Sequence, residues 1–209
     1  MSSSESSRVY IHEVSVRDGF QIEPEFIPTE QKIALINALS RTGVAKIEVT
    51  SFTSPKAIPG LADAEAVMCR IDRVPGVQYA ALVPNMRGCE RALACKVDEV
   101  NMVMSASQSH NMANLRMTSG QSLDQFAEIA RAVDGKAFLN ASLSTAFGCP
   151  FEGDVPLARV LDIVDRFADI GMQGVTLCDT TGVANPRQVS EVCQVVRDRW
   201  PGLVFTAHF

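Results

Sequence analysis

The sequence predicts an α/β protein built as a (β/α)8 barrel, the TIM-barrel architecture. Seven strand-like segments alternate with helix-like segments, which is the pattern of parallel β-α-β units. The strand candidates are rich in Val, Ile, Leu and Met, as strands covered on both faces usually are. Nearly every candidate strand also ends in a polar or ionisable residue, and a barrel would bring these ends together at one mouth.

The candidate strands are short apolar runs separated by turn and helix signals. They span residues 9–14, 46–50, 78–83, 98–104, 136–144, 174–178 and 203–208. After the first of them, Thr29 can cap a helix that runs to about Arg41. Glu30 lies in the first turn of this helix, and Gly43 follows its end.

Two later helices carry apolar stripes at helical spacing. The stripes comprise Val160, Val164, Phe167 and Ala168, followed by Gly171, and then Val189, Val192, Cys193 and Val196. Residues three or four apart share one face of a helix, so each stripe can pack against a sheet.

An open, doubly wound sheet could be built from the same units. However, the glycine-rich G-x-G-x-x-G fingerprint is absent after the first strand. The polar strand ends decide between the two, because an open sheet would spread them along a line and a barrel gathers them. They are Arg17, Asp18, Glu48, Thr50, Ser51, Asn85, Ser105, Ser107, Ser142, Ser144, Thr145, Asp179, Thr180 and His208.

The domain organisation follows from length. The chain has 209 residues, whereas a complete barrel usually takes about 250 or more. We expect a disordered lead over residues 1–8 and a catalytic barrel over residues 9–209 that lacks the last helices and strand eight. An unfinished barrel exposes two strand edges. We therefore expect a longer natural chain or a partner, such as a second copy, that covers the gap.

Composition excludes several classes of protein. The net charge is −5 and no Lys/Arg run is present, which argues against nucleic-acid binding. The apolar runs are strand-sized, so no membrane span is expected. The polar start "MSSSESSR" lacks the apolar core of a signal peptide and favours a cytoplasmic location. The six cysteines show no C-x-x-C pair and are expected to be free and mostly buried.

Several segments, in unbroken order over about residues 9–209, resemble the 3-hydroxy-3-methylglutaryl-CoA lyase family. "EVSVRDGFQIE" resembles that family's E-V-G-P-R-D-G-L-Q-N-E signature, and "GVAKIEVTSFTSPKAIPGLAD" resembles its second-strand segment. "AFGCPFEGDV", "LCDTTGVANP" and "FTAHF" resemble its G-C-P-[YF]-E-G segment, its D-T-x-G-x-x-x-P turn and the start of its H-x-H strand. The resemblance implies a metal-dependent lyase of leucine degradation that cleaves an acyl-CoA substrate to acetyl-CoA and a 3-oxoacid.

The resemblance also implies site residues. Arg17 would face the thioester oxygen and stabilise the enolate of the departing acetyl-CoA. Asp18 and His208 would bind a hard divalent cation, Mg²⁺ or Mn²⁺, with further ligands beyond Phe209. Asp18 could instead be the base that takes the hydroxyl proton. The family's catalytic cysteine belongs to a later loop, so Cys149 is expected to be a packed thiol.

Four further residues are expected in the mouth, each with an alternative. Glu48 could act there or pair with a barrel arginine, because an unpaired carboxylate on an apolar strand is costly. Asp179 could serve the metal's outer shell and a proton path, or merely cap the "DTTG" turn. Gln21 is expected to orient polar groups near Arg17, and Ser144 to contact substrate.

Other histidines and amides receive weaker interpretations. His12 is expected to be a satisfied core or barrel-bottom histidine. His110 and Asn111 are candidates for substrate selectivity, because they follow the fourth strand.

Departures from the family pattern leave rival functions open. Val16 replaces a proline, Phe20 a leucine and Ile22 an asparagine, which suggests a more apolar mouth and a larger acyl group. Claisen-type synthases of the same barrel group would carry a motif that resembles "RDGEQ", and carboxyltransferases one that resembles "RDAHQ". This chain has "RDGFQ" at residues 17–21, which matches neither motif. If half the ligand set were missing from the natural protein, a non-catalytic binding or scaffold barrel would be the remaining alternative.

Overall fold

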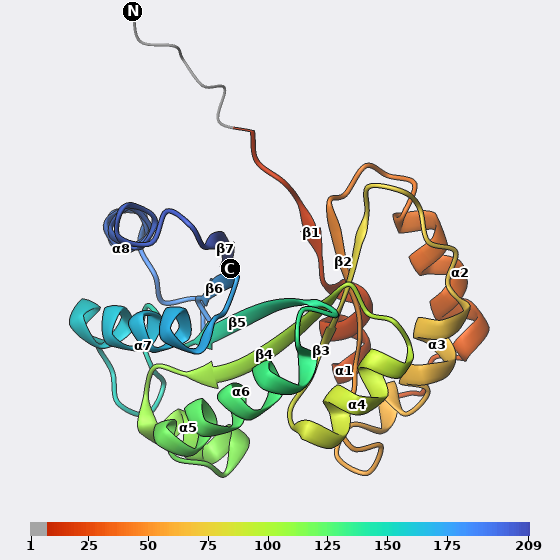
Figure 1. Cartoon of the computed structure of the whole chain (residues 1–209), viewed down its shortest axis with the longest axis horizontal. Coiled ribbons are helices and arrows are strands. Elements are labelled where there is room, and N and C mark those ends of the chain that lie inside the picture. Colours follow the sequence, from red (N-terminus) through yellow and green to blue (C-terminus); the bar gives the residue numbers. More distant parts are fainter. Residues whose placement is uncertain (1–7) are drawn as a thin grey trace, which may run out of the picture.

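The computed structural model describes residues 8–209, so the lead expected for residues 1–8 falls outside the described residues apart from Arg8. Within these residues, seven parallel strands form one sheet in the order of the chain, from β1 to β7. They are β1 (His12–Glu13), β2 (Lys46–Ser51), β3 (Gln78–Leu82), β4 (Glu99–Ser105), β5 (Phe138–Ser144), β6 (Gly174–Cys178) and β7 (Val204–His208). Figure 1 shows the sheet curling into an open barrel with β1 and β7 at its two edges.

Helices cover the outer face of this curled sheet (Figure 1). The long connections contain α2 (Thr29–Leu39), α3 (Ala64–Arg70), α4 (Met86–Ala94), α5 (Gln108–Leu115), α6 (Ser119–Val133), α7 (Leu157–Ile170) and α8 (Pro186–Arg199). Short turns complete the set: the π-helical η1 (Ser15–Gly19), α1 (Phe20–Ile22) and the 3₁₀ turn η2 (Pro59–Leu61). The predicted barrel topology is therefore confirmed as far as the seventh strand. No helix of residues 8–209 is long and apolar enough to cross a membrane.

The strands have one apolar and one polar face. On β4, Val100, Met102 and Met104 are fully buried under the helices. Glu99 and Asn101 alternate with them and face the inside of the curl. The same alternation places Asn140, Ser142 and Ser144 of β5 inside. Because side chains alternate across a strand, the inner face is a polar surface held in place by a packed outer layer.

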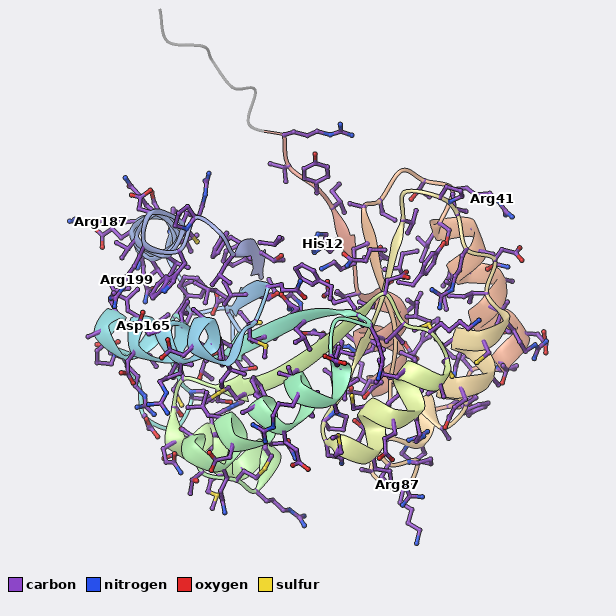
Figure 2. The ribbon with its side chains drawn as sticks, viewed as in Figure 1. His12, Arg41, Arg87, Asp165, Arg187 and Arg199 are labelled. Atoms are coloured by element: carbon purple, nitrogen blue, oxygen red, sulfur yellow. The ribbon has the colours of Figure 1, made fainter. Side chains whose placement is uncertain are left out.

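The outer layer is held by side-chain packing and surface ion pairs. Phe126 of α6 and Phe167 of α7 stack with ring centroids 5.6 Å apart. Arg199 of α8 pairs with Asp165 of α7. Figure 2 shows the charged side chains labelled on the helices and loops projecting outward, whereas His12 lies by the opening of the curl.

Two local expectations were wrong. The strand expected over 9–14 is reduced to His12–Glu13, whose partners on β2 are Lys46 and Ile47. Thr29 does not cap α2; its hydroxyl instead donates to Asp63 Oδ2 at 2.7 Å, and Pro28 occupies the cap position. The glycines that follow α2 and α7 are as expected, with positive φ at Gly43 and Gly171.

Candidate active site

The inner face of the sheet lines a cavity of about 1110 Å³. The cavity extends from the amino ends of the strands, at Lys46 and Glu99, to their carboxyl ends. All seven site residues expected from the sequence line it, namely Arg17, Asp18, Gln21, Glu48, Ser144, Asp179 and His208. Residues up to 191 positions apart in the sequence, 17 and 208, thus meet around one space, as the barrel topology requires.

The "RDG" stretch that follows the first strand is a π-helical turn. The amides of Arg17 and Asp18 both donate to the Val14 carbonyl, at 3.0 and 2.7 Å. Val16 is fully buried and anchors this turn in the core. The turn therefore delivers two consecutive charged side chains to the cavity.

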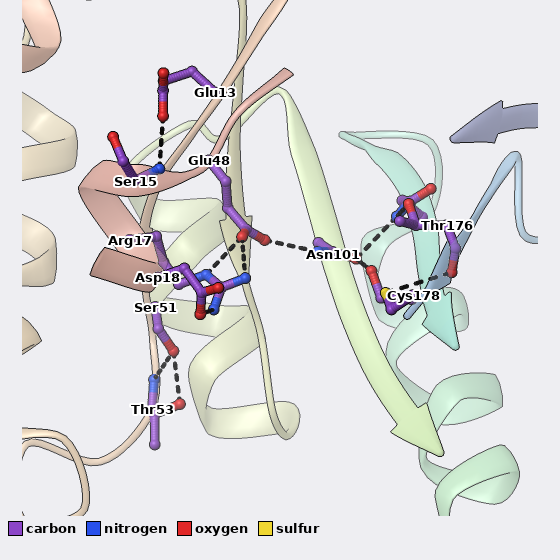
Figure 3. A network of polar contacts seen from close by, with 12 residues as sticks. Glu13, Ser15, Arg17, Asp18, Glu48, Ser51, Thr53, Asn101, Thr176 and Cys178 are labelled. Atoms are coloured by element: carbon purple, nitrogen blue, oxygen red, sulfur yellow. Dashed lines mark hydrogen bonds and ion pairs between the residues drawn. The ribbon is translucent and has the colours of Figure 1, made fainter. Parts of the chain in front are cut away.

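Arg17 and Glu48 form the central contact of the site (Figure 3). Arg17 Nε donates to Glu48 Oε2 at 2.6 Å, and Nη2 lies 2.5 Å from the same oxygen. Arg17 Nη1 donates to Asp18 Oδ1 at 2.6 Å. Glu48 therefore is the partner of a barrel arginine and also lines the cavity, so the two interpretations of Glu48 describe one contact.

The electrostatics of this cluster fix the charge of Arg17. Burial disfavours the guanidinium, but the charges of Glu48 and Asp18 outweigh it and hold the pKa of Arg17 above its usual value. Burial, reinforced by the Glu48 charge, raises the pKa of the nearby Cys178 thiol to about 12. Cys178 thus stays protonated at neutral pH and is a poor nucleophile.

Asp18 and His208 offer a carboxylate and an imidazole to the same cavity. The Asp18 side chain is 47% exposed, so it has room for a further ligand besides Arg17. Within residues 8–209, no group of three or more His, Cys, Asp or Glu side chains is placed to hold a metal ion. The two donors suit a hard cation, which takes further oxygen or nitrogen ligands besides these two.

Asp179 lines the cavity, but its carboxylate is engaged by the backbone. Its Oδ1 and Oδ2 accept the amides of Val183 and Ala184, each at 3.0 Å. These are the contacts of a residue that caps a turn, which is the alternative that the sequence left open. Gln21 lies on α1, next to the turn that carries Arg17, and Ser144 ends β5.

Two expectations for the mouth were wrong. Phe20 packs against the core and Ile22 is 80% exposed, and neither lines the cavity, because the single turn of α1 directs only Gln21 inward. Asn111 is fully buried and serves its own loop, since its Oδ1 accepts the Ser105 amide at 2.8 Å. His110 does line the cavity, where its Nδ1 lies 2.6 Å from Ser105 Oγ.

Sequence reasoning missed Asn101, which joins the central contact. Asn101 Nδ2 donates to Glu48 Oε1 at 2.7 Å. Its Oδ1 accepts from Asn140 Nδ2 at 2.9 Å and from Ser142 Oγ at 2.8 Å. The signal was an amide inside the otherwise apolar run "VNMVM", where an unpaired polar group would be costly.

A second polar cluster closes the amino end of the cavity. Lys46 pairs with Glu99, both of them buried. Burial raises the pKa of Glu99, and Lys46 offsets part of this rise. Burial and the charge of Lys46 lower the pKa of His12 to about 4, so His12 is neutral at pH 7. This end holds a structural ion pair and a neutral imidazole, in line with the barrel-bottom interpretation of His12.

Comparison with known proteins supports the sequence resemblance. The HMGL-like family model matches residues 8–209. Hydroxymethylglutaryl-CoA lyase YngG of Bacillus subtilis is 45% identical over 203 residues, which cover 97% of this chain and 68% of that protein. The (R)-citramalyl-CoA lyase of Chloroflexus aurantiacus is 36% identical over 212 residues, which cover 96% of this chain and 67% of that protein.

Solved structures show the same relationship. The HMG-CoA lyase of Bacillus subtilis superposes with a TM-score of 0.93 at 44% identity, covering 97% of this chain and 68% of that one. An HMG-CoA lyase from Acinetobacter baumannii, in complex with coenzyme A and 3-methylmalate, superposes with a TM-score of 0.90 at 45% identity, covering 94% and 65%. This chain spans about two thirds of the length of these relatives.

Proposed function

We propose that this chain, which belongs to the HMGL-like family, is a carbon–carbon lyase that cleaves a 3-hydroxy-3-methylglutaryl-CoA-like thioester. The products would be acetyl-CoA and a 3-oxoacid. The observation that carries the proposal is the buried Arg17 guanidinium, held by Glu48 and Asp18 at the wall of the cavity. Relatives named as lyases of such thioesters support it.

The reaction needs a base and a fixed positive charge. Loss of the hydroxyl proton lets the C3 oxygen become a ketone as the C2–C3 bond breaks. The electron pair of that bond passes to the thioester, which leaves as an enolate and is then protonated at carbon. Arg17 has five N–H donors and only part of them face carboxylates, so it can also donate to the thioester oxygen as negative charge develops there.

Asp18 could act as the base that takes the hydroxyl proton or as a ligand of the cation. Its carboxylate is the most exposed member of the central cluster, so it can reach a substrate hydroxyl or a cation. Asp18 and His208 would hold the divalent cation, Mg²⁺ or Mn²⁺, that the family implies. When bound, such a cation polarises the hydroxyl and carbonyl oxygens of the substrate.

The acyl-CoA substrate is best identified by a panel assay with the natural protein. The panel comprises 3-hydroxy-3-methylglutaryl-CoA, homologues with longer 3-substituents, and citramalyl-CoA, each tested with Mg²⁺ or Mn²⁺ and with a chelator. We expect acetyl-CoA release from at least one thioester, and loss of that release in the chelator. Arg17→Met serves as the inactive control. No release from any of them would refute the lyase and favour a scaffold barrel.

A Claisen-type synthase is the second candidate, because its barrel would have the same strand order. The two activities differ in the fate of the thioester. The lyase leaves acetyl-CoA intact, whereas a synthase condenses acetyl-CoA with a 2-oxoacid and hydrolyses the thioester to a free thiol. A thiol-reactive dye therefore separates them: thiol release with acetyl-CoA and a 2-oxoacid would support the synthase.

A further inference from the structure

Asn101 is the only described side chain that hydrogen-bonds the Oε1 oxygen of Glu48. Figure 3 shows Glu48 between Arg17 on one side and Asn101 on the other. The oxygen Oε2 faces Arg17, with Nε at 2.6 Å, while Oε1 takes the Asn101 amide at 2.7 Å. The two oxygens of one buried carboxylate are thus assigned to two different partners.

The orientation of the Asn101 amide is fixed by its surroundings. A carboxylate can only accept, so the NH₂ group must face Glu48. The carbonyl oxygen must then face the two donors on its other side, Asn140 Nδ2 and Ser142 Oγ. Asn140 Nδ2 also donates to Thr176 Oγ1 at 3.0 Å. A flipped amide would turn its carbonyl oxygen toward the Glu48 carboxylate and lose that bond, so Glu48 fixes the orientation of Asn101.

This network ties β2 to strands on the far side of β3. Asn101 belongs to β4, Asn140 and Ser142 to β5, and Thr176 to β6. The residue of β3 that pairs with Glu48 is Ala80, whose methyl group leaves room for the contact between β2 and β4. Within the described chain no buried side-chain nitrogen or oxygen lacks a partner, so the network is fully satisfied.

We propose that Asn101 is a positioning residue, which holds the Glu48 carboxylate so that Arg17 faces the thioester oxygen of the substrate. The inference rests on the proposed function, because it assigns a task within the same site. Asn101 does not act on the substrate itself. It sets the direction of the guanidinium through Glu48, and a small misplacement of such a group can cost a large factor in rate.

The substitution Asn101→Asp tests this role through pH. At low pH the new carboxyl group is protonated, so it can donate to Glu48 and accept from Asn140 and Ser142 as the amide does. As pH rises the proton leaves, and two carboxylates then face each other across a contact that measures 2.7 Å in the native chain. We expect kcat to fall by on the order of tenfold or more relative to wild type between low and high pH, with little change in KM.

Two further variants sharpen the test. Asn101→Leu has a similar volume and no polar atoms, so its loss of kcat should be the same at every pH. Asn37→Asp is the matched control, because Asn37 Nδ2 also donates to a carboxylate, Asp72 Oδ2 at 2.9 Å, on the exposed surface. We expect Asn37→Asp to keep the wild-type kcat at every pH.

The outcomes separate this inference from the proposed function. A wild type inactive on every thioester refutes the lyase and with it the task given to Asn101. An active wild type with an unchanged Asn101→Asp profile refutes the inference alone. A rise in KM at constant kcat assigns Asn101 to substrate binding, and a melting temperature that falls in step with kcat assigns it to folding; either result overturns the positioning role.

Discussion

Arg17 and Glu48 lie 2.5 Å apart, Nη2 to Oε2, with side chains only 10% and 5% exposed. Burying two charges carries a desolvation cost that their attraction roughly offsets, and a well-packed apolar pair of similar volume is often as stable. Stability alone therefore does not explain this pair. Its place on the wall of the cavity gives it a chemical use, and its burial makes the loss of either partner expensive.

Arg17→Met should lower kcat and kcat/KM together by on the order of 10² or more, with a smaller change in KM, because the guanidinium contact strengthens in the transition state. The same change should lower the free energy of unfolding by about 3–5 kcal/mol, since Glu48 would remain charged and buried. Steady-state kinetics and urea denaturation measure the two effects.

The double variant Arg17→Met/Glu48→Gln separates the two roles. Removing both charges should recover much of the stability and none of the activity. Arg187→Met is the surface control, because the Arg187–Glu191 pair is exposed and worth little. Activity that returns together with stability would show that Arg17 is only a structural ion-pair partner.

Asp18→Asn should leave the free energy of unfolding within about 1 kcal/mol of wild type, because this side chain is half exposed. Turnover and divalent-metal affinity should both fall strongly, since a neutral amide binds a hard cation more weakly than a carboxylate does and cannot act as a base. Activity assays and isothermal titration with Mn²⁺ measure both. Asp165→Asn on the outer helices is the control, and unchanged turnover in Asp18→Asn would remove this residue from the site.

The order of the strands and the lining of the cavity could be predicted from the sequence, because alternation of elements and polar strand ends are local patterns. Asn101 could not be assigned, since its partners Glu48 and Asn140 lie 53 and 39 positions away. The reduction of the first strand also escaped prediction. Val9 to Ile11 are apolar enough for a strand, but whether an edge segment pairs depends on its neighbour in space.

The direction in which individual side chains point could not be predicted from the sequence either. Phe20 and Ile22 flank Gln21 in the sequence, and only the helical turn decides which of them faces the cavity. Asp179 shows the same limit, because a carboxylate at a strand end can serve a turn, a substrate or both. Contacts with Val183 and Ala184 amides become visible only in three dimensions.

Stability should depend on pH through His12. Burial and the charge of Lys46 lower its pKa from 6.5 to about 4. Between these values the unfolded chain binds a proton that the folded chain does not, so the free energy of unfolding falls as pH drops from about 6.5 to about 4. Above this window the contribution is fully present.

His12→Gln should reduce this pH dependence without abolishing it, because burial also lowers the pKa of His110 and acts with the same sign. Urea midpoints at neutral pH and inside the window, for wild type and variant, measure the difference. Because both proteins carry the same carboxyl groups, the difference between their urea midpoints at equal pH cancels the contribution of those groups to stability. An equal fall in both proteins would show that His12 titrates normally in the folded state.

Gly174→Ala should disturb the hydrogen bonds of Asn101 by displacing Asn140. Gly174 of β6 pairs with Asn140 of β5, and a Cβ at this position would lie 2.6 Å from Asn140 Oδ1 and 2.9 Å from the Phe138 ring. Both distances are shorter than real contacts allow, so Asn140 or its strand must move. We expect a loss of about 1–3 kcal/mol in the free energy of unfolding.

Activity should fall further than stability explains, because Asn140 is one of the two donors that hold the Asn101 carbonyl oxygen. Gly202→Ala is the matched control, since a Cβ there meets nothing within 4 Å; its stability should stay within about 0.5 kcal/mol of wild type. Kinetics are measured well below the melting temperature of each variant. If Gly174→Ala is destabilised but retains wild-type kcat, the bond from Asn140 is not needed to hold Asn101, and the bond from Ser142 is sufficient.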